Sequence, residues 1–90
     1  MKIRCYAYFR DIIGKSEFEW TAPAPTSGAL LSDLSRQYGK PFTRWVYEGD
    51  KLSHFVIILV NGKDLRDLQG LDTPLNQDDT VVLFPPLAGG

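Results

Sequence analysis

The last residues of the chain, Pro85-Pro86-Leu87-Ala88-Gly89-Gly90, have the types and the order expected of a functional tail. Proline has a fixed φ and no amide hydrogen, so Pro85-Pro86 predicts an extended stem that stops the preceding strand. Ala88-Gly89-Gly90 has almost no side chains and could pass through a slot that admits little more than a backbone. Fully extended, the six residues would reach at most about 20 Å. A frayed terminus is the alternative interpretation.

The group that we expect to react is the carboxylate of Gly90. An α-carboxyl has a reference pKa of about 3.5, so it is ionised at neutral pH and is a poor acyl donor. Adenylation by another protein would convert it to a mixed anhydride, which a persulfide or a thiol could attack. The sequence therefore predicts a carrier whose partners supply the chemistry, and not a protein that is catalytic alone.

The other residues that could do chemistry have simpler interpretations. His54 is the only histidine and has no second ligand at metal-binding spacing, so we interpret it as a strand-edge residue. Asp78-Asp79 is typical of a solvated turn, and Asn61-Gly62-Lys63 lacks the spacing of a phosphate-binding loop. Cys5 has the parity of a buried strand position and favours a small core residue. We expect no metal site and no bound cofactor.

Composition limits the chain to one small domain and a few classes of partner. It has 90 residues, 43% of them hydrophobic, and a net charge of −1 from ten basic and eleven acidic residues. This balance argues against a nucleic-acid partner, and a single cysteine excludes an internal disulfide framework. The longest apolar run, Phe55 to Val60, is too short to span a bilayer, and no signal peptide is visible. We therefore expect a cytoplasmic protein without a membrane partner.

Hydrophobic periodicity predicts the elements that position the tail. Residues 2–9 alternate between apolar and polar, which predicts a strand with Tyr6 on its outer face and Ala7 on its buried face. Residues 17–20 alternate again, and the short loop at Gly14 favours an antiparallel hairpin.

A single amphipathic helix follows this hairpin. Thr26 or Ser27 can cap it, and it is predicted to run to about Tyr38 and to end at Gly39. We interpret the helix as the cover of the core, with a partner-binding helix as the alternative. Residues 42–54 predict a short irregular or helical excursion.

The second half of the chain predicts three more strands. Phe55 to Val60 is continuously apolar, which is typical of a central strand covered on both faces. Asn61-Gly62 predicts a tight turn into a short strand that starts at Lys63. The last strand is predicted from Thr80 to Phe84, with Val82 and Phe84 on one face.

Together these elements predict an α+β fold, in which one main helix packs on a mixed sheet of four or five strands. Residues 1–84 are expected to form the domain, and residues 85–90 to form a flexible Gly-Gly tail. If the first and last strands lie side by side, they must be parallel at the centre of the sheet.

The chain resembles the MoaD/ThiS family of ubiquitin-like sulfur carriers, and most closely its MoaD branch, the small subunits of molybdopterin synthase. The resemblance covers nearly the whole chain and implies a β-grasp fold with parallel, central first and last strands. It rests on Tyr8-Phe9-Arg10-Asp11-Ile12-Ile13-Gly14, Leu59-Val60-Asn61-Gly62-Lys63, Leu75-Asn76-Gln77-Asp78-Asp79-Thr80-Val81 and Phe84-Pro85-Pro86-Leu87-Ala88-Gly89-Gly90.

The resemblance also implies a function for the tail. A MoeB-like enzyme would use ATP to adenylate Gly90, next to Gly89, and a sulfur donor protein would complete its conversion to a thiocarboxylate. In a molybdopterin synthase, the tail would enter the active site of a MoaE-like large subunit and pass its sulfur to cyclic pyranopterin monophosphate. The family expectation is a heterotetramer of two small and two large subunits.

Family partners are also expected to contact a hydrophobic patch and the tail itself. The match to the patch falls on Tyr6, Phe84 and the neighbourhood of Leu65. The expected tail contacts are Pro85, Pro86, Leu87 and Ala88.

Several alternative functions of the tail and of the domain stay open at this point. Gly90 could instead be joined to lysines as a protein modifier, or the carrier could serve thiamine synthesis or tRNA thiolation. A non-covalent interaction domain that uses the patch is a further alternative. Residues 64–71 resemble archaeal and tungsten-cofactor versions of the family, so the sequence leaves open whether the finished cofactor holds molybdenum or tungsten. Residues 42–51 have no close counterpart in the compact ThiS branch, which weakens a thiamine assignment.

Overall fold

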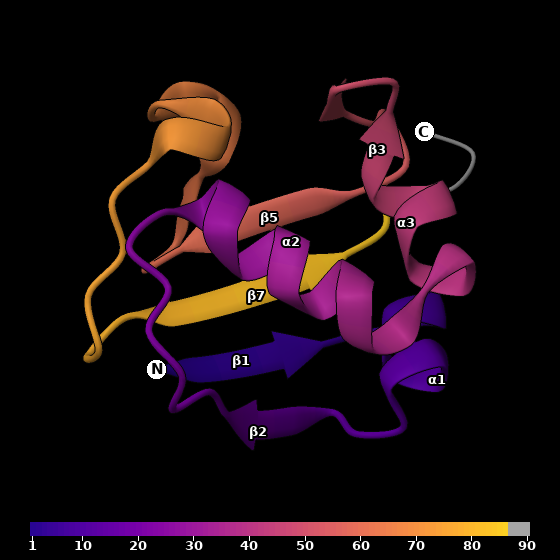
Figure 1. The fold of residues 1–90 in the computed structure, drawn as a ribbon, viewed down its shortest axis with the longest axis horizontal. Helices are drawn as coiled ribbons and strands as arrows, with labels where there is room; N and C mark the ends of the chain where they lie inside the picture. The colour runs from indigo at the N-terminus through magenta and orange to yellow at the C-terminus, as the bar shows by residue number, and fades with distance from the viewer. Residues whose placement is uncertain (87–90) are drawn as a thin grey trace.

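The computed structural model describes residues 1–86, which form a five-stranded sheet with one main helix on one face (Figure 1). A separate two-stranded hairpin lies beyond the end of that helix. The elements are β1 (Lys2–Cys5), α1 (Tyr8–Ile13), β2 (Glu17–Glu19), α2 (Ser27–Tyr38), α3 (Lys40–Val46), β3 (Tyr47–Glu48), β4 (Lys51–Leu52), β5 (Ile57–Val60), β6 (Lys63–Asp64), the 3₁₀ turns η1 (Leu65–Asp67) and η2 (Gly70–Asp72), and β7 (Thr80–Phe84).

The last strand, β7, lies at the centre of the sheet, whose order is β2-β1-β7-β5-β6. It is parallel to β1, where Cys5 pairs with Leu83. It is antiparallel to β5, where Ile58 pairs with the same Leu83. The expected parallel pairing of the first and last strands is therefore confirmed, and so is the mixed α+β architecture.

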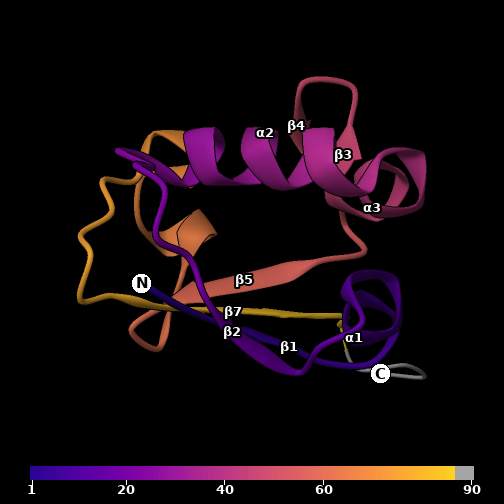
Figure 2. The ribbon, with the colours of Figure 1, turned by 60° about the horizontal axis from the view of Figure 1, so that its bottom comes forward.

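Helix α2 covers one face of the sheet and closes the core, as Figure 2 shows. Leu30, Leu31 and Leu34 on its inner side are buried. The helix begins as predicted, because the Thr26 hydroxyl oxygen accepts a hydrogen bond from the amide of Ala29 at 3.2 Å. Neither α2 nor another helix within residues 1–86 is long and apolar enough to cross a membrane.

The strand predicted over residues 2–9 is wrong beyond Cys5. β1 ends there, Ala7 takes a φ of 53°, and the chain continues as helix α1. Phe9 and Ile13 are four residues apart, so the helix buries both of them in the core. Alternation and helical spacing both place Phe9 inside, which is why the sequence pattern did not distinguish them. The same change leaves Ala7 exposed instead of buried.

The prediction of a central strand over residues 55–60 also needs correction. β5 begins at Ile57 and lies beside the central strand β7. Val60 is buried under the α2 layer, whereas Ile57 and Leu59 are half-buried on the opposite face. The run is continuously apolar because the face of the sheet opposite α2, which we call the open face, is also apolar here. No second layer covers this face in the described part of the chain.

The helical alternative for residues 42–54 is confirmed as far as Val46, and a hairpin that was not predicted follows it. Helix α3 buries Phe42 and Val46, and β3 and β4 then form the hairpin. His54 lies in the turn after β4 and is exposed, so the prediction of a strand-edge position is wrong. The chain turns at His54 because its amide donates to the Glu48 carboxylate at 2.8 Å.

Candidate functional site

The candidate site lies at the carboxyl end of β7, where the Pro85-Pro86 stem leaves the sheet (Figure 1). The end of β7 is held from both sides. The amide of Tyr6 donates to the carbonyl of Leu83 at 3.1 Å, and Phe84 pairs with Ile57 of β5. Pro85 has no amide hydrogen and cannot extend this pairing. The central strand therefore sets the direction in which the chain leaves the domain.

The predicted reactive residue Gly90 lies outside the described residues, and so do Leu87, Ala88 and Gly89. Their roles in activation and in partner binding stay predictions. What the structure describes is the stem and the surface beside it.

An apolar hollow lies next to the stem, on the face of the sheet opposite α2. It has a volume of about 430 Å³ and an almost wholly apolar lining. Tyr6 is 48% exposed, and Phe84 is half-buried. The lining residues are Tyr6, Ala7, Val82, Phe84 and Pro85. Exposed apolar surface of this kind is typical of a contact site for another molecule.

The apolar hollow continues across the open face of the sheet. Ile57 and Leu59 of β5 pair with the two β7 residues of the hollow and share their face. On the other side, Arg4 of β1 binds the Glu17 carboxylate through its Nε at 2.9 Å. The open face is therefore apolar at its centre and charged toward β2.

Tyr6 and Ala7 reach the hollow because β1 stops at Cys5. A positive φ is uncommon for a residue with a side chain, and at Ala7 it turns the chain away from the sheet and into α1. Two lining residues were not predicted as site residues. Val82 shares the parity of Phe84, so its position could have been found, whereas the longer predicted strand placed Ala7 on the buried face.

Leu65 does not belong to this surface. Its side chain is 0% exposed, because it points into the core at the start of η1. The Asp64 carboxylate accepts from the amide of Arg66 at 2.9 Å and fixes that turn. A partner contact through the Leu65 side chain is thus excluded in the folded domain, and this part of the predicted patch is corrected.

A group of aromatic side chains borders the same end of the sheet. Tyr8 stacks on Trp45 with ring centroids 4.5 Å apart, and its hydroxyl donates to the carbonyl of Phe55. Phe55 is 52% exposed and packs edge-on against Trp45 at 5.7 Å. These contacts join α1 to α3 and to the chain before β5. The sequence pattern did not reveal them, because it predicted Phe55 inside a buried strand.

The titratable groups of residues 1–86 do not form a catalytic centre at the apolar hollow. No three His, Cys, Asp or Glu side chains in this part of the chain could together hold a metal ion. Burial raises the pKa of the Cys5 thiol to about 11, so it is protonated at neutral pH. A hydrogen bond from the His54 amide lowers the pKa of Glu48, but both residues are exposed in the hairpin region. The described part of the site is therefore an apolar surface beside the stem.

The chain matches a family model described as the ThiS family over residues 3–90. It is 33% identical to the Small archaeal modifier protein 3 of Haloferax volcanii over 100% of this chain and 98% of that protein. It is 38% identical to the sulfur carrier protein CysO of Mycobacterium tuberculosis over 78% of this chain and 77% of that protein. The molybdopterin synthase sulfur carrier subunit of Escherichia coli is 30% identical over 100% of this chain and 99% of that protein.

Solved structures have the same fold. The solution structure of the HVO 2177 protein of Haloferax volcanii gives a TM-score of 0.82 at 31% identity and covers 99% of this chain and 84% of that chain. The crystal structure of CysO from Mycobacterium tuberculosis gives 0.80 at 29% identity and covers 96% of this chain and 98% of that chain. The ubiquitin-like β-grasp fold that the sequence predicts is thereby confirmed.

Proposed function

The chain belongs to the ThiS family, a family of small sulfur carriers, and from this membership we propose that its own reactive group is the carboxylate of Gly90. The observation that carries the proposal is that the family match extends to residue 90, the second glycine of a terminal Gly-Gly pair. The position of the stem supports it, because the central strand β7 directs the chain out of the domain beside an apolar surface.

The proposed chemistry begins with activation by a partner. The ionised Gly90 carboxylate is a poor acyl donor, so an adenylating enzyme would join it to AMP from ATP and release pyrophosphate. The terminal sulfur of a persulfide on the sulfur donor protein would then attack the acyl carbon and displace AMP. A second thiol of that donor would break the S–S bond of the resulting acyl disulfide, which leaves a thiocarboxylate on Gly90 and a disulfide on the donor. The chain itself contributes a terminus without side chains and a surface on which the partner docks.

We assign the docking role to the apolar hollow. Tyr6 and Phe84 would be buried against the partner, and aromatic side chains contribute strongly to such interfaces. The tail from Pro85 to Gly90 reaches at most about 20 Å, so the partner's active site must lie within that distance of the hollow. The partner would therefore bind the domain and receive the tail at the same end of the molecule.

Intact-mass analysis tests the carrier proposal. The purified chain is incubated with a MoeB-like adenylating enzyme, ATP and a sulfur donor protein. We expect a species in which one sulfur replaces one terminal oxygen, and we expect it to disappear when ATP is omitted. If only the free carboxylate is found while the enzyme converts its own natural carrier, the proposal is wrong.

For the sulfur acceptor, we propose the role of small subunit in a molybdopterin synthase. The full-length similarity to the Escherichia coli sulfur carrier subunit supports it. The thiocarboxylate would then enter a MoaE-like large subunit and transfer sulfur to cyclic pyranopterin monophosphate, in the pathway to a molybdenum or tungsten cofactor. Co-expression with the MoaE-like protein of the same organism should give a heterotetramer that makes molybdopterin. Failure of the pair to associate would contradict this role.

Protein modification is a second candidate function. The observation that favours it is the 33% identity to Small archaeal modifier protein 3 over the whole chain. In that case the Gly90 acyl group would pass to a lysine amine of another protein. Immunoblots of the source cells should then show conjugates of higher mass that vanish when Gly90 is deleted. Conjugates without molybdopterin synthesis would favour modification, and a carrier for thiamine or tRNA thiolation would show neither product.

A further inference from the structure

Strand β2 forms one edge of the sheet, and its outer side has no partner strand in the described part of the chain (Figure 1). Main-chain bonds alternate along the antiparallel pair of β1 and β2, so the amides and carbonyls of Glu17 and Glu19 point away from β1. No hydrogen bond joins these four groups to another main-chain group of residues 1–86. The bonds that set the alternation are Cys5 N to Ser16 O at 2.9 Å and Trp20 N to Met1 O at 2.7 Å.

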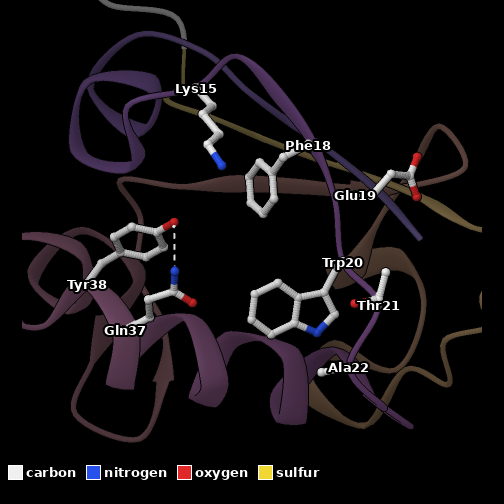
Figure 3. A pocket seen from close by; sticks show the side chains of 8 residues that line it. All are labelled: Lys15, Phe18, Glu19, Trp20, Thr21, Ala22, Gln37 and Tyr38. Carbon is white, nitrogen blue, oxygen red and sulfur yellow. Dashed lines mark hydrogen bonds between the residues drawn. The ribbon is translucent and has the colours of Figure 1, made fainter.

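A second hollow, which we call the β2–α2 groove, lies between this edge and the carboxyl end of α2. Its volume is about 260 Å³. Figure 3 shows Phe18 and Trp20 of the β2 segment on one side, facing Tyr38 and Gln37 of α2 on the other. Lys15 closes one end, with its ammonium 5.9 Å from the centre of the Phe18 ring. The groove is thus lined by three aromatic rings and by polar residues. The polar residues are Lys15, Glu19, Thr21 and Gln37.

The side chains of β2 divide between the two faces of the sheet. Phe18 pairs with the buried Ile3 and lies on the α2 side, next to the groove. Glu17 and Glu19 pair with residues of the open face, and the Glu19 carboxylate points away from the groove in Figure 3. A strand added along this edge would follow the same alternation, because paired residues share a face. Every second side chain would enter the groove, and the others would lie opposite the two glutamates.

The charges along the edge determine which side chains fit opposite the glutamates. The Glu19 side chain is 64% exposed, and its ion-pair partner is the Met1 ammonium at 3.5 Å. Glu17 binds Arg4 and Lys2, but both cations belong to β1, one strand further in. Directly opposite residues in neighbouring strands have Cβ atoms about 5 Å apart. An added strand therefore meets two carboxylates first, and basic side chains suit those positions.

A second copy of this chain fits the edge poorly. Pairing of β2 with β2 would place Glu17 and Glu19 against the same residues of the other copy. Like charges directly opposite each other destabilise strand pairing. The two glutamates thus protect the edge against self-association, as charged side chains on edge strands commonly do. They leave the edge available to a partner of opposite charge.

We propose that β2 and the β2–α2 groove bind an extended segment of a partner protein, in which apolar residues alternate with lysine or arginine. The segment adds a strand to the sheet through the main-chain groups of Glu17 and Glu19. Its apolar side chains enter the groove against Phe18, Trp20 and Tyr38. The groove lies on the α2 side of the sheet edge, whereas the apolar hollow lies at the end of the central strand on the opposite face. The proposal therefore does not depend on the function of the tail.

Nuclear magnetic resonance of the full ¹⁵N-labelled chain tests the proposal with two synthetic decapeptides. One alternates valine with lysine and the other alternates valine with glutamate. The lysine peptide should shift the amides of residues 17–20 and of Gln37 and Tyr38, and it should bind at least about tenfold more tightly than the glutamate peptide. An N-methylated version of the lysine peptide, which cannot form the main-chain bonds, should not bind.

Charge variants make the test specific for the edge. Glu19→Lys should reverse the preference between the peptides, and Glu19→Gln, which keeps the shape, should weaken it. Asp50→Lys in the distant β3–β4 turn is the matched control and should leave the preference unchanged. Equal affinity for both peptides, or shifts on β5 and β7 alone, would overturn the proposal. Shifts that depend on protein concentration without peptide would instead indicate a second copy at the edge.

Discussion

The apolar hollow depends on side chains that the fold leaves exposed beside the stem. Tyr6 is 48% exposed and lines the hollow. We expect Tyr6→Ser to lower the affinity for an activating enzyme by about tenfold or more, since buried aromatic residues dominate many interfaces. The thermal stability of the domain should change little. Titration of the enzyme against the thiocarboxylate yield measures the effect.

Leu68→Ser is the matched control for this prediction. Leu68 is also exposed, at 38%, but it lies beside Val60 and Asn61 at the other end of the sheet. This variant should react like the wild type. An equal loss in both variants would show that the hollow is not the docking surface.

Cys5 is a nucleophile that the fold makes unavailable. Its side chain is 0% exposed, and burial raises the pKa of the thiol from its ordinary value of 9.0 to about 11. We expect iodoacetamide to label it at pH 8 only after unfolding. Cys5→Ala should still form the thiocarboxylate at Gly90. Rapid labelling of the folded chain, detected by mass spectrometry, would contradict this prediction.

The same burial gives a pH dependence of stability with a definite sign. Between about pH 9 and pH 11 the unfolded chain loses the Cys5 proton while the folded chain keeps it. The contribution of the Cys5 thiol to the free energy of unfolding is therefore present below pH 9 and is lost as the pH rises toward 11. Urea unfolding across this range should show a steeper decline for the wild type than for Cys5→Ala. Parallel curves for the two proteins would refute the prediction.

At the level of elements, α2 is positioned by a close contact with the loop before β7. A Cβ atom at Gly28 would lie 2.8 Å from the main-chain oxygen of Leu71. Ser27 next to it donates through its hydroxyl to the Gly70 carbonyl at 2.7 Å, and through its amide to the Thr73 carbonyl at 2.9 Å. The start of the helix thus rests directly on η2.

Gly28→Ala should push α2 away from η2, because the obstructing atom belongs to the backbone. We expect a loss of about 1–3 kcal/mol in the free energy of unfolding, which urea denaturation measures. Ser32→Ala on the exposed side of the same helix is the control and should change it by less than about 0.5 kcal/mol. An unchanged midpoint for Gly28→Ala would show that the contact relaxes without cost.

At the scale of the whole molecule, we propose that the tail provides the reactive group and that the domain provides the stability. The buried hydrophobic residues of the described chain all precede Phe84. Deletion of Gly90 should therefore abolish thiocarboxylate formation and leave the unfolding temperature of the domain unchanged. Addition of one residue after Gly90 should have the same two effects, because it removes the free glycine carboxylate. Mass spectrometry and thermal unfolding measure them separately, and activity in either variant would contradict the proposal.

Most of the fold could be predicted from local patterns. The helix cap at Thr26, the turn at Asn61-Gly62 and the bounds of β7 agree with the structure, because each depends on residues close together in the chain. The parity of β7 likewise predicted that Val82 and Phe84 share one face, and the structure shows that this face lies opposite α2. Such features follow from backbone conformation and side-chain period alone.

The errors occurred at residues whose environment depends on elements that are distant in the sequence. Phe9 is buried by a helix and not by a long strand, and Phe55 is exposed although it opens an apolar run. Leu65 resembles a surface residue of the family but lies in the core. In each case a neighbouring element decides whether the side chain is covered, and that element is distant in sequence.

The sequence by itself determined the composition and order of the Gly-Gly tail, the α+β class and the family of this protein. Only the tertiary structure decided that Tyr6, Val82 and Phe84 share one hollow beside the stem, and that the outer side of β2 has no partner strand among residues 1–86. Both results depend on the parallel pairing of β1 with β7, which joins segments from opposite ends of the chain. No local pattern specifies such a pairing, because its stability comes from burial of both strands under a helix that lies between them in sequence.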